Sequence, residues 1–216
     1  FIVIFLMMAG AMTFSLGRFF GRGQADLGPF FGFVPWLFLF LVPALTMRLW
    51  AEERRLGTIE LLLTLPLAQW QAVLGKFLAA WAFCAIALAL TFPLVITVNF
   101  LGRPDNGVIA AGYGACLLMA GAYLAIGSAM SAMTKNQVIA FILATVVSGI
   151  NLLLMFAVVV MPASVGEVVQ YLSAYYHFES LGRGVIDWRD VLFFASVTAG
   201  LLLITTQTLT QHRRVG

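Results

Sequence analysis

The sequence predicts an all-α membrane protein: a bundle of six transmembrane helices, with a short amphipathic helix on the cytoplasmic side and an amphipathic outer helix before the last span. The composition is 62% hydrophobic and 10% charged, whereas soluble domains carry about a quarter charged residues. The 12 Lys and Arg and the 9 Asp and Glu residues also fall into six short clusters separated by uncharged segments. Because lipid offers no hydrogen-bond partner to an exposed backbone, the spans must be helices.

The uncharged segments define the spans in order. The second and sixth have about the length needed to cross roughly 30 Å of hydrocarbon at 1.5 Å per residue. The third, fourth and fifth are longer, which implies tilt or ends that project into the headgroups. The first begins without a Met or a basic flank, so we expect the native protein to extend further upstream. We expect one domain over residues 1–216, with spans at about residues 1–17, 29–49, 77–101, 108–133, 137–161 and 191–211.

The charges of the loops predict the orientation. Six spans place both termini on the same side as the loop at residues 48–76 and as Lys135. This set of segments holds 7 basic and 3 acidic residues, against 5 basic and 6 acidic residues on the opposite side. The positive-inside rule therefore predicts a multi-pass protein of the inner (cytoplasmic) membrane with both termini in the cytoplasm.

Few polar side chains lie within the spans, and none of them is charged. An ion-coupled carrier normally needs ionisable groups at membrane depth, so the sequence disfavours that class. Asn151 in the fifth span either makes an interhelical hydrogen bond or lines a substrate path. Gly114, Gly121 and Gly127 in the fourth span predict close helix packing, with dimerisation as the alternative.

The sequence shows no catalytic or cofactor site. Both cysteines lie in the middle of apolar spans, where a thiol behaves as a small hydrophobe, and the two histidines lie on opposite sides of the predicted membrane. A phosphate-binding loop needs a Gly, four residues and then Gly-Lys-Ser/Thr. At Gly75-Lys76, Trp70 replaces the first Gly and Phe77 replaces the hydroxyl. We therefore expect no cofactor and no metal in this chain, and a membrane-embedded enzyme is disfavoured. The net charge of +3 is no sign of nucleic-acid binding.

The cytoplasmic segment between the second and third spans predicts a helix over about residues 51–65. Apolar residues recur at helical spacing from Leu56 to Leu63, and charged residues populate the other faces. Pro66 ends this helix, and a second helix begins near Ala68 and runs into the third span.

Two interpretations of this segment are open. It could lie on the bilayer surface, with Trp50 and Trp70 in the aromatic belt. Its three acidic residues and Gly57 suit a protein partner better than an anionic lipid surface.

The outer segment predicts a helix over about residues 163–181. Val165, Val168 and Leu172 follow the helical repeat of an apolar face, and Gly182 ends the pattern. An interfacial helix that caps the bundle explains this pattern. His177 then lies in the aromatic belt between Tyr176 and Phe178, with a role in substrate contact as the alternative.

Two stretches resemble a known family. Residues 53–66 read ERRLGTIELLLTLP and residues 73–76 read VLGK, which resembles the E-R-x-x-G-T-[IL]-E-x-L-L-x-x-P…x-G-K signature of ABC type-2 exporter permeases. The stretch from Tyr175 to Asp190 is similar to the segment before the last helix of the same family. The similarity extends over nearly the whole chain and is greatest to gliding-motility-associated membrane subunits. That family begins with a cytoplasmic elbow helix, which we expect in the part of the native protein upstream of Phe1.

The resemblance implies the partners. Two such subunits pair as a homodimer in membrane lipid, and each docks one of two copies of a separate ABC ATPase that binds ATP and Mg. This chain would then not be an enzyme itself. The ATPase-coupling residues implied are Arg54, Arg55, Leu56, Gly57, Thr58, Ile59, Glu60 and Leu63.

The resemblance also favours a re-entrant lid over the exit of a dimeric pathway, formed by Tyr175, Tyr176, His177 and Phe178, with Asn151 as a possible path residue. The implied function is export of an unidentified substrate, driven by ATP hydrolysis in the partner. The alternative is a non-transporting module that transmits force to an accessory or outer-face protein. No nucleic-acid partner is expected.

Overall fold

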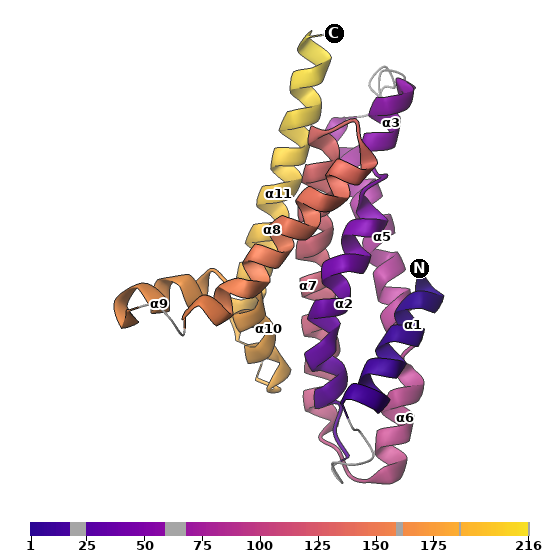
Figure 1. The fold of residues 1–216 in the computed structure, drawn as a ribbon, viewed down its shortest axis with the longest axis vertical. Coiled ribbons are helices and arrows are strands. Elements are labelled where there is room, and N and C mark those ends of the chain that lie inside the picture. Colours follow the sequence, from indigo (N-terminus) through magenta and orange to yellow (C-terminus); the bar gives the residue numbers. More distant parts are fainter. Residues whose placement is uncertain (18–24, 59–67, 159–161, 186, 216) are drawn as a thin grey trace.

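The computed structural model describes residues 1–17, 25–58, 68–158, 162–185 and 187–215. Among these residues there are helices and no strands. In the described part of the chain, five apolar segments are long enough to cross a membrane: Gly28–Leu56, Gln69–Leu101, Asn106–Met133, Gln137–Ala157 and Trp188–Gln211. The all-α membrane fold predicted from the sequence is therefore confirmed (Figure 1).

The N-terminal segment forms a shorter apolar helix, Ile2–Leu16. It consists of α1 (Ile2–Ala11) and a π-helical continuation over Met12–Leu16. It packs against α2 (Gly28–Thr46) and α5 (Gln69–Ala89), and Phe5 in α1 stacks on Phe38 in α2 with 5.9 Å between the ring centroids.

The central element of the bundle is α7 (Asn106–Met133). It contacts α2, α5, α8 (Gln137–Ala157), α10 (Ala174–Gly182) and α11 (Trp188–Val215), and every residue from Met119 to Ala129 is buried. Small residues on α7 make this possible. A Cβ added at Gly127 would overlap the side chain of Thr46 in α2, whereas one added at Gly114 would meet no described atom within 4 Å.

The segment predicted as the third span contains two helices. Ala68 is the N-cap of α5, as the sequence predicts, and α6 (Phe92–Leu101) continues in nearly the same direction after a break at Leu90 and Thr91. Pro93 lies in the first turn of α6, where its missing N–H costs no helical hydrogen bond. The Thr91 hydroxyl lies 2.6 Å from the carbonyl oxygen of Leu88 and 2.7 Å from the hydroxyl of Tyr113 in α7.

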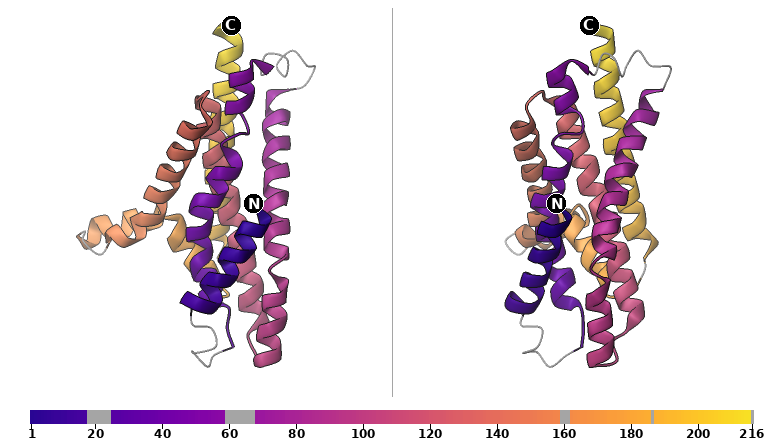
Figure 2. Two further views of the ribbon diagram at one scale, coloured as in Figure 1. Left: turned by 45° about the vertical axis from the view of Figure 1, so that its right-hand side comes forward. Right: turned by 90° about the vertical axis from the view of Figure 1, so that its right-hand side faces the viewer.

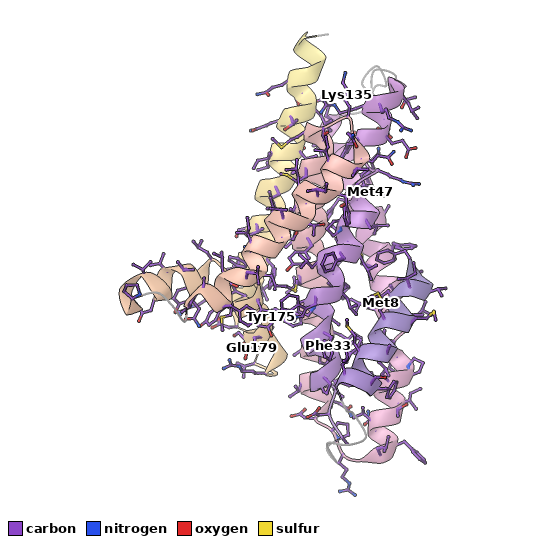
Figure 3. The ribbon with its side chains drawn as sticks, in the orientation of Figure 1. Met8, Phe33, Met47, Lys135, Tyr175 and Glu179 are labelled. Carbon is purple, nitrogen blue, oxygen red and sulfur yellow. The ribbon has the colours of Figure 1, made fainter. Side chains whose placement is uncertain are left out.

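The two segments outside the predicted spans lie towards opposite ends of the bundle. α3 (Ala51–Leu56) and the C-terminus share one end, here called the α3 end, and α10 lies towards the opposite end (Figures 1 and 2). α9 (Ala163–Tyr171) projects sideways beyond α8. Lys135 lies near α3, and Tyr175 and Glu179 lie far from it (Figure 3).

Both of these segments differ in detail from the continuous helices predicted for residues 51–65 and 163–181. α3 ends at Leu56 because Gly57 adopts a left-handed conformation with φ of 73°, which is favourable for glycine. Residues 59–65 lie outside the described residues. The outer segment is divided into α9 and α10 at Leu172 and Ser173.

Candidate functional site

Trp50 fastens the start of α3 to the central helix α7. Its side chain is fully buried, and its indole N–H donates to the Ser128 hydroxyl at 3.0 Å. The backbone N–H groups of Trp50 and Ala51 each donate to the Ser131 hydroxyl oxygen at 3.1 Å, and that hydroxyl donates to the Met47 carbonyl oxygen at 3.0 Å. The first N–H groups of a helix have no partner within it. Here α7 supplies an acceptor, so Trp50 belongs to a helix junction and not to an aromatic belt.

Lys76 ties the same junction to α5. Its ammonium group pairs with the Glu53 carboxylate and donates to the Leu49 carbonyl oxygen at 2.7 Å. It also lies 4.1 Å from the centroid of the Trp50 ring, within range of a cation–π attraction. In addition, the Arg54 guanidinium donates to the Ala132 carbonyl oxygen at the end of α7. α3 is therefore bound to both α5 and α7.

The predicted coupling residues that the structure describes divide into two groups. Arg54 is half-buried in the junction, and Arg55, Leu56, Gly57 and Thr58 are exposed. Leu56 leaves 62% of its surface exposed, which presents an apolar side chain at the tip of the bundle. The remaining predicted residues, Ile59, Glu60 and Leu63, lie outside the described residues.

Asn151 holds the turn between α9 and α10. Its side-chain amide donates to the Leu172 carbonyl oxygen at 3.0 Å, and its side-chain oxygen accepts from the Ala174 backbone N–H at 2.9 Å. The Ser173 hydroxyl donates to the Asn151 backbone carbonyl at 3.3 Å. Asn151 thus has the interhelical role considered from the sequence, and these bonds are the physical reason that the outer segment is divided at this turn.

His177 is buried, with 5% of its surface exposed, so placing it in the aromatic belt was wrong. Its Nδ1 atom lies 2.7 Å from an oxygen of Asp190, and its Nε2 atom lies 3.0 Å from the Tyr171 carbonyl oxygen. The imidazole stacks on Phe193 with 4.0 Å between the ring centroids. The sequence did not identify Asp190 as a partner of His177. An acidic residue in the first turn of a helix is already explained by its favourable interaction with the helix dipole.

A cavity of about 360 Å³ lies beside α10 at the end opposite α3. Its wall includes Phe31, Ile109, Tyr175 and Phe178, and the charged residues that line it are Asp26, Asp105, Glu179 and Arg183. Burial and, to a smaller degree, the nearby Glu179 carboxylate raise the pKa of Tyr175, so its hydroxyl stays protonated at neutral pH. Two of the four predicted lid residues, Tyr175 and Phe178, thus line a cavity, while His177 points into the protein interior.

Within the part of the chain that the structure describes, no group of three or more His, Cys, Asp or Glu residues is arranged to hold a metal ion.

Comparison with known proteins identifies the family of this chain. The profile of the family described as ABC-2 family transporter protein matches residues 23–188. The matched region includes the junction at α3 and the outer segment with α10. No individual curated protein matches the chain significantly. The chain belongs to the ABC-2 family of transporter proteins, and it is therefore the multi-pass transmembrane component of an ABC transporter, a type of component that works with an ABC ATPase.

Proposed function

We propose that this chain is the permease of an exporter in the inner membrane, closest to the gliding-motility-associated group, and that a separate ATPase docks on α3 and the residues after it. The observation that supports this most directly is the junction of Trp50, Lys76 and Ser131. These contacts connect α3 to both α5 and α7, so a force applied to α3 would reach two transmembrane helices. Two copies of the chain pair, and each engages one of the two ATPase subunits, where ATP and Mg bind.

The contacts suggest a route by which a movement of α3 reaches the rest of the bundle. A displacement of α3 is passed to α7 through Ser131 and to α5 through Lys76. α7 in turn packs against α10 and α11. Packed helices move as discrete units, so closure of the ATPase would push α3, rock the two bundles and shift α10. Tyr175, Tyr176, His177 and Phe178 then act as part of an outer lid that opens when the bundles rock.

A force-transmitting module without a transported substrate is the second candidate. The projection of α9 favours it, because α9 extends sideways beyond α8 and leaves Val165, Val168 and the C-cap residue Leu172 exposed. Such a face suits lipid or an accessory outer-face protein. The two candidates differ in what stimulates ATP hydrolysis by the complex in liposomes. A substrate stimulates it in the exporter, and only the protein partner does so in the force transmitter.

The docking proposal is tested by copurification of the chain with its ATPase. Glu60 would pair with a basic residue of the ATPase, and losing one partner of a buried charge pair costs about 2–5 kcal/mol. Glu60→Lys should therefore abolish copurification while leaving membrane insertion unchanged. Lys135→Glu is the matched control, because Lys135 is exposed at the same end of the bundle and lies outside the proposed docking segment. An intact, active complex with Glu60→Lys would contradict the proposed docking site.

A further inference from the structure

The cavity beside α10 has the size and the wall of a small-molecule site. Its volume of about 360 Å³ falls within the range of roughly 300–1,000 Å³ that is usual for ligand pockets. Phe31, Ile109 and Phe178 in its wall are each at most 8% exposed, so packing behind the wall holds them in place. Tyr175, on α10 (Figure 3), extends this surface, with its ring centroid 6.4 Å from that of Phe178. The wall therefore fits an apolar or aromatic group.

Close backbone contacts fix the elements that surround the cavity. A Cβ added at Gly184, just after α10, would lie 2.7 Å from a methyl carbon of Val108 in α7. In the loop before α7, a Cβ added at Gly102 would overlap the side chain of Ala25, which lies just before α2. α10 and the loops before α2 and α7 are thus held together, so the cavity is part of the packed fold.

Carboxylates determine the sign of the charge at this cavity. Of the charged lining residues that the structure describes, Glu179 and Arg183 pair with each other at 3.2 Å, so their charges offset. Asp26 and Asp105 have no described ion pair. Each uses one carboxylate oxygen to accept backbone N–H groups at the start of α2 or α7, and the second oxygen makes no described hydrogen bond. The described lining residues therefore carry an excess of negative charge.

Capping of the two helices does not by itself account for these two acids. A neutral Asn or Ser accepts the same backbone N–H groups about as well as Asp does, so capping requires an oxygen and not a charge. A carboxylate beside an apolar wall repels an anion and attracts a cation. Aromatic rings such as those of Phe31 and Phe178 also attract a cation that approaches their faces. Both features favour a ligand that combines a positive charge with an apolar body.

We propose that this cavity binds organic cations in which an ammonium group is attached to an apolar or aromatic body. The body contacts Phe31 and Phe178, and the ammonium group faces Asp26 and Asp105. A soluble amine and the headgroup of phosphatidylethanolamine both supply this chemistry. That such cations are the transported substrate rests on the exporter function proposed above, whereas binding itself needs neither the ATPase nor a second copy of the chain.

The test is equilibrium dialysis of the purified chain in micelles of an uncharged maltoside detergent, with protein-free micelles as the blank. The probes are (2-naphthylmethyl)trimethylammonium and 2-naphthylmethanesulfonate, which share an aromatic body and carry opposite charges that do not titrate. We expect the cation to bind at least about tenfold more tightly than the anion, because attraction to two carboxylates becomes repulsion. Equal affinities, or no binding of the cation above the blank, would overturn the proposal.

Variants that remove single charges should change the affinity in opposite directions. Asp26→Asn and Asp105→Asn keep an oxygen that accepts the backbone N–H groups. Each should weaken cation binding by about two- to fivefold, the effect of losing an exposed charge pair. Arg183→Gln leaves Glu179 unpaired and should strengthen binding. Asp187→Asn, which removes an exposed acid outside the cavity wall, should leave binding unchanged. Unchanged affinity in both Asp26→Asn and Asp105→Asn, or weaker binding in Arg183→Gln, would overturn the proposal.

A variant that fills the cavity tests where the probe binds. Gly32 lines the cavity, and a Cβ added there would meet no described atom within 4 Å. The side chain of Gly32→Leu should therefore occupy the cavity and leave the Tm unchanged. We expect cation affinity to fall by at least about tenfold, because the aromatic body loses apolar contact area. Gly114→Leu is the matched control, since its Cβ also meets no described atom within 4 Å and Gly114 does not line the cavity. Unchanged binding in Gly32→Leu would place the probe elsewhere and overturn the proposal.

Competition by lipids separates the two sources of the ammonium group. Phosphatidylethanolamine added to the micelles displaces the cation probe when its headgroup occupies the cavity, and phosphatidylglycerol, which has no ammonium group, does not. Displacement by phosphatidylethanolamine alone would support the lipid as the source, and displacement by neither would support a soluble amine. Equal displacement by both lipids would show that charge is not recognised and would overturn the proposal. No ATPase is present, so these results are independent of the proposed docking function.

Discussion

Lys76 contacts three different groups that are remote in the sequence: the Glu53 carboxylate, the Leu49 carbonyl oxygen and the Trp50 ring. The family motif indicated that the Gly75-Lys76 position matters, but it did not identify these contacts. Glu53 lies 23 residues before Lys76, and no local pattern reveals a pair at that separation. The same holds for His177 and Asp190, which are joined only when α10 folds back onto α11.

At this residue scale we predict that Lys76→Met destabilises the protein. The change leaves the half-buried Glu53 without its ion-pair partner, and a hydrogen bond to a charged group contributes about 1.5–3 kcal/mol. Each kcal/mol lowers the Tm by about 2–4 °C in a chain of this size. Thermal unfolding of the purified protein in detergent measures this loss.

Lys135→Met is the control for the loss of a positive charge at the same end, since Lys135 is exposed and has no described ion pair. Its Tm should be unchanged. Adding Glu53→Gln to Lys76→Met should recover part of the lost stability, because the unpaired charge is then removed. Equal Tm values for Lys76→Met and the unchanged protein would show that the Lys76 pair contributes no net stability.

At the scale of the elements, hydropathy predicted where the long helices lie but not where the shorter ones break. α7 begins two residues before the predicted start of its span, and α8 begins at the predicted residue. α9 and α10 were expected as one helix because their apolar residues keep helical spacing across the break. The break depends on Asn151, which bonds to the turn from another helix. Tertiary contacts of this kind override local periodicity.

The packing of α2 against α7 predicts opposite effects for two similar substitutions in α7. Gly127→Ala should destabilise the protein, because its Cβ would overlap Thr46 in α2 and overpacking costs about 1–3 kcal/mol. Gly114→Ala should leave stability unchanged or increase it by up to about 1 kcal/mol, because alanine favours helix over glycine and no described atom lies within 4 Å of the new Cβ. Urea or thermal unfolding in detergent compares the two variants. Equal stability of both would contradict close packing at Gly127.

At the scale of the whole molecule, the structure groups the charged segments as the loop pattern predicts. α3 and the C-terminus lie together, and Asp26, Asp105 and Glu179 meet around the cavity at the opposite end. The fold class and this grouping could be predicted because both follow from the cost of placing charges in hydrocarbon. The cavity could not, because its wall combines residues from α2, α7 and α10 whose relative positions depend on side-chain packing.

This arrangement makes the orientation in the membrane testable with single cysteines, after Cys84 and Cys116 are replaced by Ala. A membrane-impermeant maleimide added to whole spheroplasts should label two exposed positions, Asn106→Cys at the start of α7 and Arg183→Cys in the lining of the cavity beside α10. It should not label Gly57→Cys or Lys135→Cys, which are exposed at the α3 end, until the membrane is opened with detergent. The prediction follows from the 7 basic residues on the α3 side against 5 on the other. The reverse pattern would place α3 outside the cell, where no ATP-driven subunit could engage it, so it would reject the docking proposal together with the orientation.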